Sequence, residues 1–312
     1  MTRFSLLIAA LVAAPAFAAA APAPALETDF AAAKRALQAQ RPAAFADGEN
    51  TVDHLLGLLD DFDQNVRAAA AKALRAYAPA DRRVSDRLTE IMENGNDNLF
   101  VRKEAIKSLS PLAAQSNDVR RKMIAVAQER NNPDTVRMIA CKSLYSTLFP
   151  GSAANDTRDA LISILEESSD HPAVRAAAAW GLFPDAATGR TQDALLHAAE
   201  DQWLNADARA EAIKSLYFVL DQRRAVEDAL KSLADEGLTA MPTRFAAVLV
   251  FHRVNQDHGI ADWLQDLAKN ASPEQIRTAA VLAQTPGLTE ELARYFHYTN
   301  LNRRTLDPLE NE

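Results

Sequence analysis

The chain has 312 residues, with 34 Lys and Arg against 42 Asp and Glu, which gives a formal net charge of −8. This acidic balance disfavours nonspecific binding to nucleic acid or anionic lipid. A single cysteine, Cys141, excludes an internal disulfide, so stability has to come from packing. With only 9 Gly, 6% aromatic residues and no stretch of alternating β-branched residues, the composition favours an all-α fold.

The first eighteen residues have the pattern of an export signal. Arg3 precedes an apolar run at residues 4–12, and Ala16-Phe17-Ala18 forms a small-x-small cleavage site. The run is too short to span a membrane. We therefore expect residues 1–18 to be a signal peptide cut after Ala18 and the mature protein to be periplasmic or secreted. Residues 19–50 are expected to form a flexible lead and an N-terminal capping helix.

From about Thr51 the chain repeats a pattern centred on an arginine. Seven arginines, spaced 33 to 38 residues apart, are each followed three residues later by alanine, and this period is typical of a solenoid. These arginines are Arg67, Arg102, Arg137, Arg175, Arg209, Arg244 and Arg277. Positions one before and seven after the arginine are mostly apolar, so these offsets place a core stripe on one side of a helix.

A second amphipathic helix lies between successive arginine helices. Each unit is therefore predicted to be a helical hairpin of about 35 residues that buries its apolar stripe only when stacked on its neighbours. Prolines mark the expected limits of the arginine helices. Starts are predicted near Pro133, Pro172, Pro242 and Pro273, and ends near Pro79, Pro111, Pro150, Pro184 and Pro286.

One unit resembles a known family. The stretch from Asp170 to Leu182, with Val174-Arg175 followed by Ala178-Ala179 and Gly181-Leu182, is similar to the second helix of a HEAT repeat of the short bacterial type also found in phycobilin-lyase-like proteins. The resemblance covers residues 51–287 and implies a right-handed α-solenoid of about seven hairpins, armadillo-like in architecture. Tetratricopeptide arrays have a similar period, but their Trp, Leu-Gly and Tyr landmarks are missing. Residues 288–312 are expected to form a C-terminal capping helix and tail.

The sequence contains no pattern typical of catalysis. Cys141 stands where the other repeats have apolar residues, so a small core residue is favoured over a nucleophile. The repeated arginines are interpreted as structural, each bonding an acidic or carbonyl partner, with an anion-binding ladder as the alternative. The six histidines lack zinc-site spacing, and no phosphate loop or nucleophile elbow is present. We predict no catalytic residue, no metal and no cofactor.

Positions one, five and eight after each arginine share a side of the helix that is distinct from the core stripe. In HEAT-like solenoids the second helix generally lines the concave surface, so this side is predicted to face a groove. Along the chain the groove would be basic, then aromatic, then apolar. Clustered aromatic residues flanked by cations are typical of a protein-binding hot spot. The alternative is that the lysines are solvated and the aromatic residues pack between repeats. The candidate residues are Lys72, Arg75, Lys103, Lys107, Lys142, Tyr145, Trp180, Phe183, Lys214, Tyr217, Phe245 and Leu249.

These features predict an exported, non-enzymatic scaffold or adaptor that binds a protein or peptide partner in its groove. A lyase-like or cofactor-chaperone protein of the same repeat family is the alternative, and it is implied by the resemblance alone. The export signal and the acidic charge disfavour nucleic-acid binding.

Overall fold

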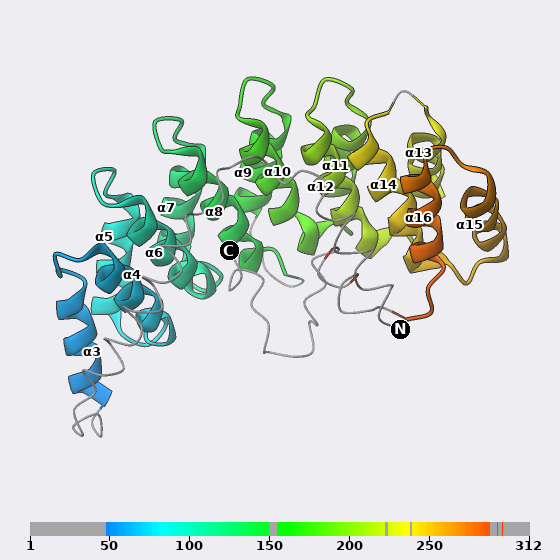
Figure 1. The fold of residues 1–312 in the computed structure, drawn as a ribbon. Coiled ribbons are helices and arrows are strands. Elements are labelled where there is room, and N and C mark those ends of the chain that lie inside the picture. Colours follow the sequence, from blue (N-terminus) through cyan, green and yellow to red (C-terminus); the bar gives the residue numbers. More distant parts are fainter. Residues whose placement is uncertain are drawn as a thin grey trace. The chain divides into compact units, whose positions relative to one another are not determined.

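The computed structural model describes residues 48–149, 155–221, 224–237 and 239–287, together with Leu292 and Tyr295. These residues form fourteen α-helices and no strand (Figure 1), which confirms the all-α solenoid fold. The predicted signal peptide, the lead up to residue 47 and most of the predicted C-terminal cap and tail lie outside the described residues. None of the helices in the described ranges is both long and apolar enough to cross a membrane.

The chain divides into two compact units, residues 1–146 and residues 147–312, here called unit 1 and unit 2. From residue 48 onward, unit 1 contains three hairpins, which are α3 (Gly48–Leu58) with α4 (Gln64–Ala73), α5 (Arg82–Glu93) with α6 (Leu99–Ala113), and α7 (Asn117–Gln128) with α8 (Asp134–Ser143). Unit 2 contains four, which are α9 (Asn155–Glu166) with α10 (Pro172–Gly181), α11 (Gly189–Glu200) with α12 (Ala206–Leu216), α13 (Arg224–Asp235) with α14 (Met241–Leu249), and α15 (His258–Asn270) with α16 (Glu274–Ala283).

Local sequence sets where the second helix of each hairpin begins. Asp63 caps α4 by accepting the N–H of Asn65 at 2.8 Å. Pro172 opens α10, where a missing backbone donor costs nothing. As predicted, Pro133 and Pro273 stand immediately before α8 and α16.

The prediction that a helix stops at Pro111 is wrong. Helix α6 runs from Leu99 to Ala113 and contains Pro111 in its last turn. Proline removes one backbone donor and crowds the preceding turn. Because α6 ends two residues later, the disturbance affects only the end of the helix.

Within each unit the first helices of the hairpins form one layer and the second helices form another. In unit 1, α4 packs on α6 and α6 on α8; in unit 2, α10, α12, α14 and α16 pack in series. Contacts between neighbouring second helices are more extensive than those between neighbouring first helices. The second helices therefore form the tighter layer of each stack.

The predicted core stripe explains this close approach. The alanine three residues after the arginine is fully buried in all seven repeats, and so is the large apolar residue seven after it in the first six. In the last repeat that position is Gln284, which is half-buried and donates its amide to the carbonyl of Leu264 at 3.2 Å. Small side chains at the helix contact let the backbones approach, and the flanking leucines fill the remaining space.

Candidate functional site

The repeated arginines bind backbone rather than an open surface. In five repeats the guanidinium donates from Nε to the carbonyl oxygen ten residues earlier, at the end of the first helix of the same hairpin. These bonds are Arg102 to Met92 (3.2 Å), Arg137 to Ala127 (2.9 Å), Arg175 to Leu165 (2.8 Å), Arg209 to Ala199 (2.8 Å) and Arg244 to Ala234 (2.9 Å). All five side chains are buried, so the structural interpretation is confirmed.

The outermost arginines use a different carbonyl. Arg67 donates to Asp61 O at 3.0 Å and Arg277 to Ala271 O at 2.8 Å, each six residues earlier. Arg67 also pairs with Asp97 of the next hairpin at 2.9 Å. Asp97 lies five residues before Arg102, but its ion pair is with Arg67 of the preceding repeat.

Cys141 and His171 both occupy structural positions in the described part of the chain. Cys141 is fully buried, as predicted for a core residue. His171 is the N-cap of α10, where its Nδ1 accepts the N–H of Ala173 at 3.2 Å. Within the described ranges, no group of three or more His, Cys, Asp or Glu residues is placed to hold a metal ion.

The candidate groove residues lie on what we call the second-helix face, the positions one, five and eight after each arginine. In unit 1 this face is polar and partly open. Lys72 is exposed, Arg75, Lys103, Lys142 and Tyr145 are half-buried, and Lys107 is buried. Burial raises the pKa of the Tyr145 phenol, and the positive charge of Arg75 opposes that rise.

In unit 2 the predicted aromatic groove is not open. Trp180 and Tyr217 are each 3% exposed, and Phe183, Phe245 and Leu249 are buried as well. The prediction that these side chains line an accessible groove is wrong, and the alternative, packing, holds for them. Burial of a large apolar ring removes much apolar surface from water and so stabilises the fold. These side chains are therefore packed inside unit 2 and do not line an open groove.

Two contacts show how these aromatic residues pack. Trp180 lies edge-on against Phe183 with ring centroids 5.3 Å apart, within one hairpin. Tyr217 stacks on His252 of the next hairpin, and its hydroxyl lies 3.2 Å from His252 Nδ1. His252 Nε2 in turn lies 3.0 Å from the carbonyl oxygen of Gly287. A chain of polar contacts therefore links three successive segments of unit 2.

The same ion pair occurs on the face of both units. Lys107 Nζ lies 3.3 Å from Glu104, and Lys214 Nζ lies 2.6 Å from Glu211, both pairs being three residues apart on a helix. In each repeat the glutamate stands two residues after the arginine and the lysine five after it. Desolvation disfavours the charged form of Lys214, but its interactions with Glu211, Tyr295 and Asp207 together outweigh desolvation, and the pKa of Lys214 is raised.

A residue from outside the repeats lies on the face of unit 2. The ring of Tyr295 is 4.6 Å from Lys214 Nζ and packs edge-on against Phe245, with ring centroids 6.2 Å apart. Desolvation raises the pKa of Tyr295 to about 12, while Lys214 acts in the opposite direction. The sequence places Tyr295 in a predicted capping helix but gives no sign of this contact, which joins residues 81 and 50 positions apart.

Serines six residues after the arginine bond neighbouring second helices together. Ser108 Oγ donates to Ala71 O at 2.8 Å, and Ser215 Oγ donates to Ala179 O at 2.9 Å, in each case in the preceding hairpin. The recurrence of serine at this position in three of the seven repeats was the available signal. These bonds fix the register between neighbouring second helices.

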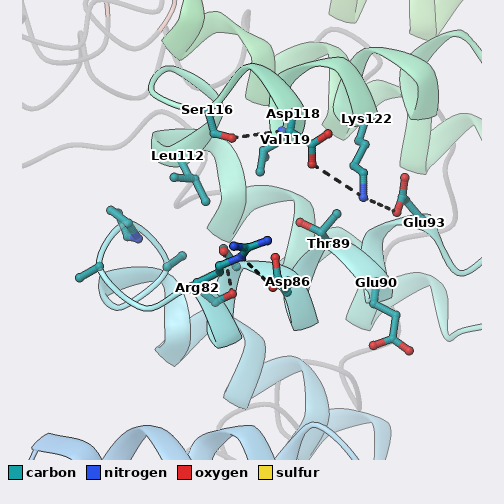
Figure 2. Close-up of a pocket in the computed structure, with 14 residues that line it drawn as sticks. Arg82, Asp86, Thr89, Glu90, Glu93, Leu112, Ser116, Asp118, Val119 and Lys122 are labelled. Atoms are coloured by element: carbon teal, nitrogen blue, oxygen red, sulfur yellow. Dashed lines mark hydrogen bonds and ion pairs between the residues drawn. The ribbon is translucent and has the colours of Figure 1, made fainter.

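The first-helix layer of unit 1 carries a polar cavity of about 620 Å³ between α5, α7 and the loop before α5 (Figure 2). Its walls hold ion pairs from Lys122 to Glu93 at 3.2 Å and to Asp118 at 3.9 Å, and from Arg82 to Asp86 at 3.4 Å. Exposed pairs of this kind contribute little to stability. Outward charges on a first helix are typical of a solvated surface, so the sequence gives no sign of this cavity.

Unit 2 contains a buried ionic cluster at the turn between its first two hairpins. Asp185 accepts Arg158 Nε at 2.6 Å and a second guanidinium nitrogen at 2.9 Å. The hydroxyls of Thr188 and Thr191 also donate to this carboxylate. Desolvation raises the pKa of Asp185, but these hydrogen bonds outweigh it and hold the pKa below its ordinary value. All partners are satisfied within the cluster, so its role is structural.

Comparisons with known proteins agree with this architecture. A family model described as HEAT repeats matches residues 23–110 and again residues 52–144. No curated protein sequence matches the chain. The two matches together span residues 23–144, which include the first three hairpins, and they agree there with the resemblance inferred from the arginine repeat.

Three solved structures are similar at low identity. The complex of CpcE and CpcF of phycocyanin lyase from Nostoc sp. shares 17% identity over 83% of this chain and 97% of that one, with a TM-score of 0.44. YibA of Escherichia coli shares 18% over 80% and 99%, with a TM-score of 0.42. Yeast importin-beta (Kap95p) shares 16% over 86% of this chain and 39% of that one, with a TM-score of 0.49.

Proposed function

Because the chain carries HEAT repeats, we propose that it is an exported, non-enzymatic scaffold that binds a protein or peptide partner on its second-helix face. One observation carries this proposal. Tyr295, which belongs to none of the seven repeats, packs on Lys214 of α12 and Phe245 of α14. The face of unit 2 thus accepts an aromatic side chain from a separate segment, which is the kind of contact a bound partner makes.

The chemistry of the repeats supports a binding role. The polar residues that recur in every unit are the arginines, and the structure uses them to hold the hairpins together. The face itself varies from repeat to repeat, because position five is lysine throughout unit 1 but is Trp180, Lys214 and Leu249 in the first three hairpins of unit 2. In repeat proteins a constant interior combined with a variable face is the basis of specific binding surfaces.

Site-specific crosslinking tests the binding face. A photoreactive amino acid at Lys72 or Lys142 in unit 1, or at Ala176 in unit 2, is expected to capture the same partner in intact cells. Matched controls at Arg121 of α7 and Asp193 of α11, which are exposed on first helices, are expected to capture none. Equal capture from both layers, or none from the face, would contradict the proposal.

The export part of the proposal is supported by the signal pattern of residues 1–18. Alkaline phosphatase, which is active only outside the cytoplasm, fused after residue 47 is expected to be active. Replacing two apolar residues of the run, Leu6 and Leu7, with arginine should abolish that activity. Full activity of the arginine variant would contradict export through this segment.

A further inference from the structure

The polar cavity of unit 1 contains a buried hydroxyl group that has no partner in the fold. Thr89 of α5 is 5% exposed and lines the cavity. Figure 2 shows its hydroxyl oxygen directed into the space between the carboxylates of Asp86 and Asp118. Among the described residues, none forms a hydrogen bond with this hydroxyl. A buried polar group without a bond costs free energy, so a ligand that bonds to Thr89 would recover that cost.

The other buried threonines of the described chain are bonded within the fold. Thr147 donates to Thr157 at 3.0 Å, Thr191 donates to Asp185, Thr239 donates to Glu236 at 2.5 Å, and Thr243 donates to the carbonyl of Ala206 at 3.3 Å. The hydroxyls of these residues therefore serve the architecture of the hairpins. Thr89 departs from that rule at the one place where its side chain meets a cavity.

The cavity carries a surplus of negative charge. Its ionisable residues are Arg82, Asp86, Glu90, Glu93, Asp118 and Lys122. Glu90 is engaged with Arg87, a residue outside the lining, at 2.5 Å. Without Glu90, three carboxylates still face two cations. The local charge therefore favours a cationic ligand over an anionic one.

The lining already holds one ammonium group. Lys122 of α7 lies 3.2 Å from Glu93 of α5 and 3.9 Å from Asp118 of its own helix. Asp86 is less engaged, because its ion pair is with Arg82 at 3.4 Å and that side chain is 91% exposed. Asp86 and Thr89 are three residues apart on α5 and so share a side of the helix. Both can accept a hydrogen bond, and one ammonium group has three to donate.

The rest of the lining is apolar. Ala78, Leu112 and Val119 face the cavity, and Val119 is 6% exposed. The volume of about 620 Å³ lies within the range of roughly 300–1,000 Å³ that is typical of sites for small molecules. A ligand that combines an ammonium group with a short aliphatic chain matches both parts of this lining.

We propose that the cavity between α5 and α7 is a binding site for a small aliphatic amine. The ammonium group donates to the Asp86 carboxylate and to the Thr89 hydroxyl oxygen, and the aliphatic chain lies on Leu112 and Val119. The site is on the first-helix layer and does not depend on binding of a partner to the second-helix face. A lysine side chain carries the same group, but the volume and the buried hydroxyl favour a free amine.

Titration of butylamine into the ¹⁵N-labelled full chain, followed by nuclear magnetic resonance, tests the site. Amide signals of α5 and α7 near Thr89 and Val119 are expected to shift and to saturate. Butanol, which has the same length and no charge, should leave them in place. The absence of saturable shifts with butylamine would overturn the proposal. A blocked peptide with a central lysine should bind at least ten-fold more weakly, and equal binding would overturn the assignment to a free amine.

Two threonine variants separate binding from stability. Thr89→Val keeps the shape of the side chain and removes the hydroxyl, so amine binding should weaken about ten-fold. The melting temperature of the amine-free variant should be unchanged or higher, because no hydrogen bond within the fold is lost. Thr191→Val of α11 should have the opposite effect, a lower melting temperature with unchanged amine binding. A destabilised Thr89→Val protein with unaltered affinity would show a structural hydroxyl and overturn the proposal.

Two aspartate variants separate the site from general electrostatic attraction. Asp86→Asn is expected to weaken amine binding about ten-fold, because the ammonium loses its charged acceptor. Asp193→Asn removes an exposed carboxylate of α11, outside the cavity, and should leave the affinity unchanged. Equal effects of the two substitutions would show that the amine responds to net charge alone, which would overturn the assignment to this cavity.

Discussion

The second-helix faces of the two units follow the same repeat and carry different chemistry. Five residues after the arginine, unit 1 has Lys72, Lys107 and Lys142, whereas unit 2 keeps one lysine, Lys214, and has Trp180, Leu249 and Leu282 in its other hairpins. The first face is polar and partly open, while the second is aromatic, packed and contacted by Tyr295. The arginine and the buried alanine are common to both. The repeat fixes the interior of each hairpin and leaves this face free to diverge.

The sharpest test of that difference is truncation at one repeat position in each unit. Trp180→Ala should lower the free energy of unfolding by about 3–5 kcal/mol, because it removes a buried ring that packs on Phe183. Lys72→Ala, at the equivalent exposed position, should change it by no more than about 0.5 kcal/mol. Urea denaturation followed by circular dichroism measures both. Similar losses would show that the two faces are packed alike.

The buried carboxylate of unit 2 should produce the next largest effect. Ten residues after Arg175, unit 2 has Asp185 in an ionic cluster, whereas the residues ten after Arg67 and Arg102 in unit 1 are Tyr77 and Leu112. Asp185→Ala leaves Arg158 without its carboxylate and should cost about 3 kcal/mol at neutral pH. Because the folded-state pKa is lowered, this stability is present above the unfolded pKa near 4 and is lost as pH falls through the folded value. The difference between the two proteins should therefore shrink in acid, and a constant difference down to pH 2 would contradict the ionic role.

The arginine bonds should also differ in strength between the units. Arg102 donates twice to Met92 O and once to Asn132, while Arg209 donates only to Ala199 O and leaves one buried nitrogen unpaired. Arg102→Ala should cost about 2–3 kcal/mol and Arg209→Ala about 1 kcal/mol. Parallel denaturation of the two variants gives the comparison. The reverse order would mean that the unpaired nitrogen is bonded in solution.

The smallest expected effect concerns the contact that covers the face of unit 2. Folding raises the pKa of the Tyr295 phenol from 10 to about 12. The neutral phenol therefore stabilises the folded state fully below pH 10, and this stabilisation is lost as pH rises towards 12. Near-ultraviolet circular dichroism should show this loss for the unaltered protein. Tyr295→Phe, which cannot ionise, should retain the contact over the same range. Identical pH profiles would exclude ionisation of Tyr295 as the cause.

The sequence was sufficient for the interior of the hairpins. The arginine register predicted the helices, the buried alanines and the core position of Cys141, because a fixed offset on one helix determines which residues share a side. It also predicted that the arginines are structural, although the carbonyl ten residues earlier emerges only from the folded hairpin. Local periodicity was enough wherever the contacts are local.

The candidate face was less predictable because its exposure depends on distant residues. Offsets place Trp180 and Phe245 on the correct side of their helices but do not show whether the next hairpin or the C-terminal segment covers them. The open aromatic residues are found elsewhere: Phe62 and Trp203, in loops between helices, are 93% and 96% exposed. No repeat pattern marks such loop positions.

The bond from each arginine to the carbonyl ten residues earlier also bears on how the chain folds. It closes a short loop and brings a positive charge to the negative end of the first helix's dipole, so the two helices of a hairpin can associate before their neighbours are in place. Contacts this close in sequence form quickly. Folding can therefore start at any of several hairpins and spread outward, and losing one arginine should slow the nucleation of its own hairpin while the others still fold at their normal rate.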